Sequence, residues 1–230
     1  QCAEGGAAPR KLSKDEAKRA QKVAGKLLLL ARAIGSTMLH ALNELACDVP
    51  EGTEKALAAA SYLLSCAACS PRPRARLHAS GMALQAGSGA ALNARPRARS
   101  RAGGFRCLGS KSNGLLSAPI LVASKSTKGA MGSAAEAEAA ATHLNAKEAA
   151  PARQCLEEVG HPQPAARARA GSATAKGLAS STTKQKRSKA CGRQVWWLKG
   201  REQQLHSHAT WGAGTYSLAG YPAKHHSAQH

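Results

Sequence analysis

The apolar content of this chain is carried mainly by small side chains, and this limits how deep a core it can build. Of its 230 residues, 43% are hydrophobic, but only 3% are aromatic and there is a single Phe. Large apolar side chains supply most of the free energy of burial, about 1.5–3 kcal/mol each when fully buried. An alanine-rich chain can therefore form only a shallow core, either over its whole length or only in part.

The charge of the chain is strongly unbalanced. There are 33 Lys and Arg residues against 13 Asp and Glu residues, which gives a formal net charge of +20. Such an excess draws polyanions by long-range attraction and by the release of their counterions. We therefore expect a nucleic-acid partner that is bound with low specificity.

Cysteine usage and hydropathy argue against a secreted or membrane-bound protein. The seven Cys residues are odd in number and irregular in spacing, which indicates an intracellular protein, cytoplasmic or nuclear, rather than a disulfide framework. Cys66 and Cys69 form one CxxC pair, but no second pair follows at zinc spacing. The longest apolar run, residues 27–31, is far shorter than the ~20 residues of a spanning helix, so no membrane partner is expected. Nothing in the sequence indicates the oligomeric state.

Three helices are predicted in residues 1–70. Ser13 and Glu16 have the spacing of a capping box, and apolar residues then recur with a helical period until Gly35. A second helix is expected over residues 38–46 and a third over residues 53–69. Residues 71–76, rich in Pro and Arg, predict a linker.

The local pattern is also clear in three later segments. Residues 134–149 and 189–205 are expected to be helical, with Val195, Trp196 and Leu198 on the buried side of the second helix. Residues 120–122 (Ile-Leu-Val) are the only segment whose composition is that of a buried strand. The first residue is Gln rather than Met, which indicates a fragment of a longer polyprotein.

Several segments resemble, in the right order, parts of copia-type retrotransposon polyproteins, from the end of the reverse transcriptase region through the ribonuclease H domain. At residues 184–190 and 217–226, KQKRSKA and SLAGYPAKHH are similar to the family's KQKRSKA and NLADYFTKHH. The other segments are LSKDE (12–16), GKLLLLARAIGSTMLHAL (25–42), GTE (52–54), ARSRAGG (98–104), SAAEAEAAATHLNAKEA (133–149) and LEEVGHPQP (156–164). The order and spacing of these segments, rather than any single motif, carry the resemblance.

The resemblance implies an α/β fold. Residues 77–230 would form a ribonuclease H-like mixed sheet with flanking helices, preceded by a helical segment at residues 1–70 similar to the end of the reverse transcriptase region. Strands would follow residues 78–84 and lie at residues 102–108, 118–124, 166–170 and 205–211. The implied ancestral activity is hydrolysis of the RNA strand of an RNA–DNA hybrid, in which four acidic side chains hold two magnesium ions.

Only one of the four acidic positions that the resemblance identifies still carries an acid. Glu138 is retained, whereas Gly89, Gly171 and Gly220 stand where the family has Asp. A single carboxylate cannot hold two metal ions, and glycine offers no ligand. We therefore expect an inactive, degenerate copy with no metal site and no bound cofactor.

Other Asp positions of the family have changed in the same direction. Glycine also replaces Asp at Gly35, Gly81, Gly192 and Gly200, and only Asp15 and Asp48 remain in the chain. A single direction of change indicates drift or editing at the nucleotide level.

Two functions remain open at this point. The chain is either the inactive remnant of a retrotransposon ribonuclease H, or a non-enzymatic, basic and partly disordered nucleic-acid-binding protein. In both cases the expected partner is an RNA–DNA hybrid or another nucleic acid. The expected contacts are Arg97, Arg99, Arg101, Lys184, Lys186, Arg187 and Lys189.

Overall fold

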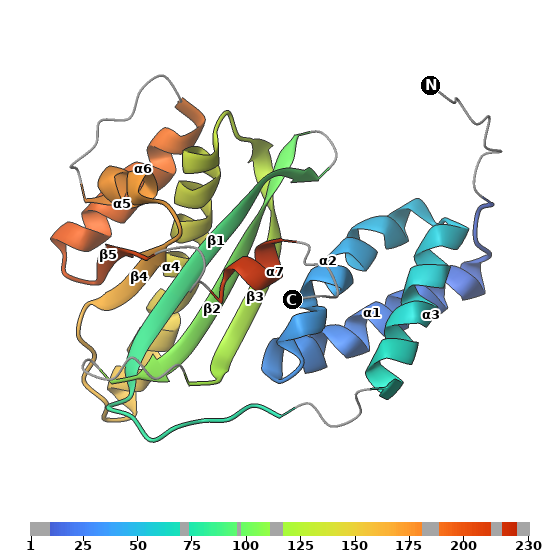
Figure 1. Cartoon of the computed structure of the whole chain (residues 1–230), viewed down its shortest axis with the longest axis horizontal. Helices are drawn as coiled ribbons and strands as arrows, with labels where there is room; N and C mark the ends of the chain where they lie inside the picture. Colours follow the sequence, from blue (N-terminus) through green and yellow to red (C-terminus); the bar gives the residue numbers. More distant parts are fainter. Residues whose placement is uncertain are drawn as a thin grey trace. The chain divides into compact units, whose positions relative to one another are not determined.

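The computed structural model describes residues 10–69, 74–95, 98–110, 117–180, 189–212 and 218–224. The chain divides into two compact units, Gln1–Arg74 and Ala75–His230 (Figure 1). The first unit is helical, and the second contains the sheet.

The first helix of the first unit, α1 (Lys14–Ala33), begins at the capping box that the sequence predicts. The backbone N–H of Glu16 donates to Ser13 Oγ at 3.3 Å, and the backbone N–H of Ser13 donates to Glu16 Oε2 at 2.8 Å. Two backbone donors that a helix start leaves without a partner are thereby satisfied. The side-chain hydrogen bond from Arg10, helped by the Ser13 amide, lowers the pKa of Glu16 to about 2.

Two further helices complete the first unit. They are α2 (Leu39–Asp48) and α3 (Glu54–Cys69), each preceded by a short 3-10 turn, η1 (Ser36–Met38) and η2 (Val49–Glu51). All three helices pack on one another. The core residues include Ala20, Leu27, Ala31, Leu39, Leu42, Leu45, Ala56, Ala60 and Leu63. Leu supplies most of the apolar area that is buried, while the alanines let the helices approach closely.

The second unit is built on one mixed five-stranded sheet in the order β3-β2-β1-β4-β5. The strands are β1 (Ala83–Arg95), β2 (Arg99–Gly109), β3 (Pro119–Ala130), β4 (Ala166–Ala170) and β5 (Ser207–Trp211). β1, β2 and β3 pair antiparallel, whereas β4 pairs parallel with both β1 and β5. The prediction of an α/β fold with a mixed sheet and flanking helices is confirmed.

One face of the sheet is covered by the long helix α4 (Ala134–Glu158) (Figure 1). Alanines meet at this boundary from both sides: Ala90 of β1 and Ala102 of β2 pack against Ala137, Ala140 and Ala141 of the helix. Because the side chains on both surfaces are small, this core is as shallow as the composition indicates.

A buried polar network fastens α4 to the centre of the sheet. Asn145 Nδ2 donates to the carbonyl oxygen of Gly103 at 2.8 Å. Arg106, whose side chain is 0% exposed, donates to Asn145 Oδ1 at 3.1 Å and to Glu148 Oε2 at 2.7 Å. Burial tends to raise the pKa of Glu148, but Lys125 and Arg106 outweigh it and the pKa is lowered. The buried charges are therefore paired, as their desolvation requires.

α4 runs nine residues further than the sequence predicts, from the expected end at Ala149 to Glu158, and it contains Pro151. A proline inside a helix removes one hydrogen bond and crowds the preceding turn. Tertiary packing holds the extension in place, since Leu156 packs against a cluster that contains Leu84, Ala86 and Ala149. Here contacts with the sheet override the local signal for a helix end.

The helices α5 (Ala173–Ala179) and α6 (Lys189–Gln203) pack along α4. Val195 and Leu198 are buried as predicted, but the prediction for Trp196 is wrong, because its side chain is 73% exposed. Residues three apart share a helix face, whereas the neighbour of Val195 is turned by about 100°. Trp197 packs instead, partly buried against Ala146, Leu198 and Ala209.

The opposite face of the sheet carries the short helix α7 (Gly220–Ala223), red in Figure 1. A Cβ atom on Gly103 would overlap Ala219 O and would stand 2.8 Å from the backbone nitrogen of Ala223. Glycine at this position of β2 thus lets the segment around Ala219 rest directly on the sheet.

The strand predicted around residues 120–122 is present, but it is not buried throughout. Val122 is 1% exposed, whereas Ile120 is 41% exposed. β3 lies at the edge of the sheet, and successive side chains of a strand point to opposite faces. The composition therefore predicts the strand correctly and its burial only in part.

Candidate active site and nucleic-acid contacts

Glu138 is half-buried on α4, beside the middle of β1 and the end of β4. Its Oε1 atom accepts a hydrogen bond from the backbone N–H of Ala90 at 3.1 Å. The nearby backbone N–H of Gly171 and the ammonium of Lys224 also favour the charged form of this carboxylate. Burial outweighs these three contributions and raises the pKa of Glu138 above its usual value.

Of the three glycines of the expected site, Gly171 lies against this carboxylate, and Gly89 and Gly220 lie against each other. A Cβ on Gly171, directly after β4, would stand 3.2 Å from Glu138 Oε1. Gly89 lies on β1 next to Ala90, and a Cβ there would stand 3.2 Å from the backbone nitrogen of Gly220. The tertiary structure therefore brings together the four positions, which are far apart in the sequence.

The residues present do not fit a magnesium ion. Glu138 Oε1 accepts from the backbone N–H of Ala90, and its Oε2 is buried with no hydrogen-bond partner. Across the described part of the chain, no group of three or more His, Cys, Asp or Glu side chains could hold a metal ion. A raised carboxyl pKa and a nearby ammonium further disfavour a divalent cation at this place.

An acid could not simply be restored at each glycine without other changes. A Cβ on Gly89 would stand 3.0 Å from Ala219 O, a backbone atom, so the chain around Ala219 would have to move. A Cβ on Gly171 would be tight against the Glu138 carboxylate, whereas the space at Gly220 is open. The packing of this segment has thus closed over the space that a side chain at Gly89 would need.

The structure tests the surface exposure of only some of the predicted nucleic-acid contacts. Arg97, Lys184, Lys186 and Arg187 lie outside the described residues, and so does the side chain of Lys189. Arg99 is half-buried on β2.

The prediction that Arg101 contacts nucleic acid is wrong, because its side chain is 0% exposed and has no surface to offer a ligand. Arg101 lies near the start of β2, an interior strand of the sheet, paired with Ala91 on one side and Ser126 on the other. The basic run around residue 99 resembles a solvated surface in the sequence, but β2 carries it into the middle of the sheet.

The sequence reasoning missed a row of lysines on α1. Lys14, Lys18, Lys22 and Lys26 recur every four residues, and all four are exposed. Residues at this spacing lie along one side of a helix, about 6 Å apart along its axis. No ion pair with a described acid neutralises any of them. The four-residue period is visible in the sequence itself and would have been a sufficient signal.

Comparisons with known proteins give a limited result. No family model matches the chain, and no curated protein matches it either. Among the solved structures that it matches are two ribonucleases H. One is the N-terminal ribonuclease H domain of a Mycobacterium tuberculosis protein, which was solved as a fusion with maltose-binding protein. It is 9% identical with a TM-score of 0.41, and the match covers 59% of this chain and 86% of that one. The other is ribonuclease H1 of the halophilic archaeon Halobacterium salinarum: 10% identity, TM-score 0.37, covering 57% and 86%.

The fold class of the second unit is α/β, with the mixed five-stranded sheet and the flanking helices described above. None of the helices in the described ranges is long and apolar enough to cross a membrane.

Proposed function

We propose that residues 77–230 are a catalytically inactive relic of the ribonuclease H domain of a copia-type retrotransposon. Residues 1–70 would then derive from the end of the adjoining reverse transcriptase region, joined by the linker at residues 71–76. The observation that supports the proposal is that Gly171 lies against the Glu138 carboxylate, while Gly89 lies next to Ala90, whose backbone N–H donates to that carboxylate, and against Gly220. The chain would act inside the cell, cytoplasmic or nuclear, where its nucleic-acid partners are.

Inactivity follows from the chemistry of this arrangement. Two-metal hydrolysis needs a set of oxygen ligands that holds both ions beside the scissile phosphate. Here one carboxylate is offered, its charged form is disfavoured by burial, and a lysine lies nearby. Neither the nucleophile nor the stabilisation of the leaving oxygen can be supplied.

A cleavage assay tests this proposal. The purified full chain is incubated with a labelled RNA–DNA hybrid in magnesium or manganese, beside the Glu138→Gln variant prepared in the same way. We expect both proteins to show the same background, because contaminating nucleases affect them equally. Hybrid-specific cleavage by the parent that disappears in the variant would refute the proposal.

The proposed origin has a separate test. A remnant of a retrotransposon should be flanked in its genome by the remains of the same element. We expect a disrupted integrase frame or reverse transcriptase frame upstream of this one, and an intact unrelated gene structure would argue against the origin.

Binding of nucleic acid without catalysis is the second candidate function, and two observations favour it. The chain has a net charge of +20, and the lysines of α1 are exposed and free of ion pairs with described acids. A basic surface of this kind binds phosphate backbones with little regard for sequence.

A further inference from the structure

A cavity of about 480 Å³ lies in the second unit, between α4 and α6 and against β1, β4 and β5. Its floor consists of alanines: Ala86, Ala146, Ala149, Ala166 and Ala168. Protein interiors are normally packed to the density of organic crystals. Larger side chains at these positions would fill the cavity to that density. The small side chains leave a space in the size range of small-molecule sites, about 300–1,000 Å³.

One wall of the cavity is aromatic. Trp197 lines it, held edge-on against the His143 ring with the ring centroids 5.0 Å apart. The guanidinium of Arg201 lies 5.2 Å from the centroid of the Trp197 ring. Trp197 is therefore fixed from two sides and offers a flat apolar surface next to a cation.

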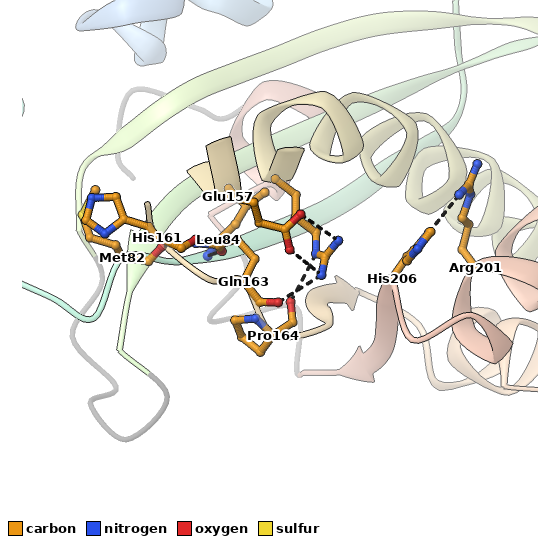
Figure 2. A network of polar contacts seen from close by, with 9 residues as sticks. Met82, Leu84, Glu157, His161, Gln163, Pro164, Arg201 and His206 are labelled. Atoms are coloured by element: carbon orange, nitrogen blue, oxygen red, sulfur yellow. Dashed lines mark hydrogen bonds and ion pairs between the residues drawn. The ribbon is translucent and has the colours of Figure 1, made fainter. Parts of the chain in front are cut away.

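Two arginines that line the cavity, Arg153 and Arg201, have different partners. Figure 2 shows Arg201 beside His206 and, apart from them, Glu157 near Gln163 and Pro164. The charge of Arg153 is neutralised, since its Nη2 pairs with Glu157 at 2.9 Å, and its guanidinium also donates to the carbonyl oxygens of Gln163 and Pro164. Arg201 contacts no described carboxylate; its Nη1 lies 3.3 Å from Gln204 Oε1 and 2.9 Å from His206 Nδ1. The charge of Glu157 is thus neutralised by Arg153. No described carboxylate neutralises the positive charge of Arg201.

The contact between Arg201 and His206 also defines a second donor. A guanidinium can only donate, so His206 Nδ1 must accept, and the proton of the neutral ring then lies on Nε2. Both residues line the cavity. The remaining N–H groups of Arg201 and the Nε2–H of His206 provide donors for one small anion.

We propose that this cavity binds a small aromatic carboxylate. Its ring would lie on the alanine floor beside Trp197, and its carboxylate would accept hydrogen bonds from Arg201 and His206. The site is separate from the position of Glu138, because α4 rises about 12 Å from Glu138 to Ala146, its first residue that lines the cavity, at about 1.5 Å per residue. It is independent of the proposed relic function and of nucleic-acid binding.

The test is a titration of the full chain with 2-naphthoate, followed by the indole N–H signals in ¹⁵N NMR spectra. We expect the Trp197 signal to shift and to saturate, while the signal of Trp211, which does not line the cavity, stays in place. Tryptophan-to-phenylalanine variants assign the three indole signals. The absence of a Trp197 shift, or equal shifts of all three signals, would overturn the proposal.

Two pairs of variants separate the apolar floor from the anion contact. Ala149→Leu fills the floor and should abolish the shift, whereas Ala134→Leu on the exposed start of α4 should leave it unchanged. Arg201→Gln should weaken 2-naphthoate binding at least tenfold without weakening the neutral analogue 2-naphthalenemethanol. Arg193→Gln, an exposed change on the same helix, is its control.

Circular dichroism melts establish that each variant is folded before it is titrated. A folded Ala149→Leu variant with parental affinity would show that the ligand lies elsewhere. If Arg201→Gln weakens the acid and the alcohol equally, or neither of them, the role assigned to Arg201 is wrong.

Discussion

Burial controls the behaviour of single residues in this chain, and Glu138 is the clearest case. Its pKa is raised in the folded state above 4.5, chiefly by desolvation. As pH rises from the unfolded pKa through the folded one, the folded protein holds a proton that the unfolded chain has lost, so the free energy of unfolding falls. Glu138→Gln keeps an oxygen acceptor for Ala90 N–H and removes this titration. We expect it to unfold with a flatter pH dependence and to be more stable than the parent at neutral pH.

Urea unfolding between pH 4 and pH 8 measures this difference. Glu158→Gln is the matched control, because it changes an exposed acid near the end of the same helix. Parallel pH profiles for the parent and Glu138→Gln would contradict the pKa argument.

A second prediction at the residue scale concerns Gly104. A Cβ at this position would overlap Asn145 Oδ1 and stand 2.6 Å from Asn145 Cγ. Asn145 bridges Gly103, Ala141 and Arg106, so it cannot move without breaking buried hydrogen bonds. We expect Gly104→Ala to destabilise the second unit by about 2–4 kcal/mol, from overpacking and lost hydrogen bonds together. Thermal unfolding compared with Gly129→Ala, whose Cβ meets nothing within 4 Å, tests this.

At the scale of elements, α4 is the piece that organises the second unit, and Pro151 is its weak point. The proline leaves the carbonyl of Lys147 without its helical donor, yet the helix continues to Glu158. Pro151 is exposed, so replacing it removes little packing. We expect Pro151→Ala to stabilise the protein by about 1–3 kcal/mol, the cost of proline in a helix less the entropy regained by the unfolded chain. Denaturant unfolding beside Pro119→Ala, at the start of β3, is the measurement, and a lower midpoint for Pro151→Ala would contradict it.

At the scale of the whole molecule, charge dominates. We expect the chain to bind duplexes, hybrids and single strands with similar affinity, and log affinity to fall linearly with log salt, by about 0.9 per neutralised phosphate on B-form DNA. Changing Lys14, Lys18, Lys22 and Lys26 together to Gln should lower this slope by up to about 3.6 if each lysine contacts one phosphate. Fluorescence anisotropy at several salt concentrations measures it. An unchanged slope would remove α1 from the interface, and strong preference for a hybrid would indicate a shaped groove instead.

Short-range patterns determined much of the secondary structure from the sequence alone. The capping box at Ser13, the helical periods of α1 to α3 and the composition around Val122 depend on residues only a few positions apart. The observed ends of an element differ from the predicted ends where contacts with distant segments act. At Pro151, for example, the packing of Leu156 extends α4 beyond its predicted end. The prediction that Trp196 is buried was wrong for a related reason. The sequence indicates that a helix has an apolar face but does not define the exact rotation of that face.

The sequence by itself also determined that the core has small side chains and that the chain carries an excess of positive charge. Only the tertiary structure decided that Gly171 lies against Glu138 and Gly89 against Gly220, that Arg101 is buried, and that a cavity opens over the alanines of α4 and β4. The physical reason is the range of the interactions. Caps and periodicities act between neighbours in the chain, whereas burial, desolvation and empty space depend on which distant segments pack together.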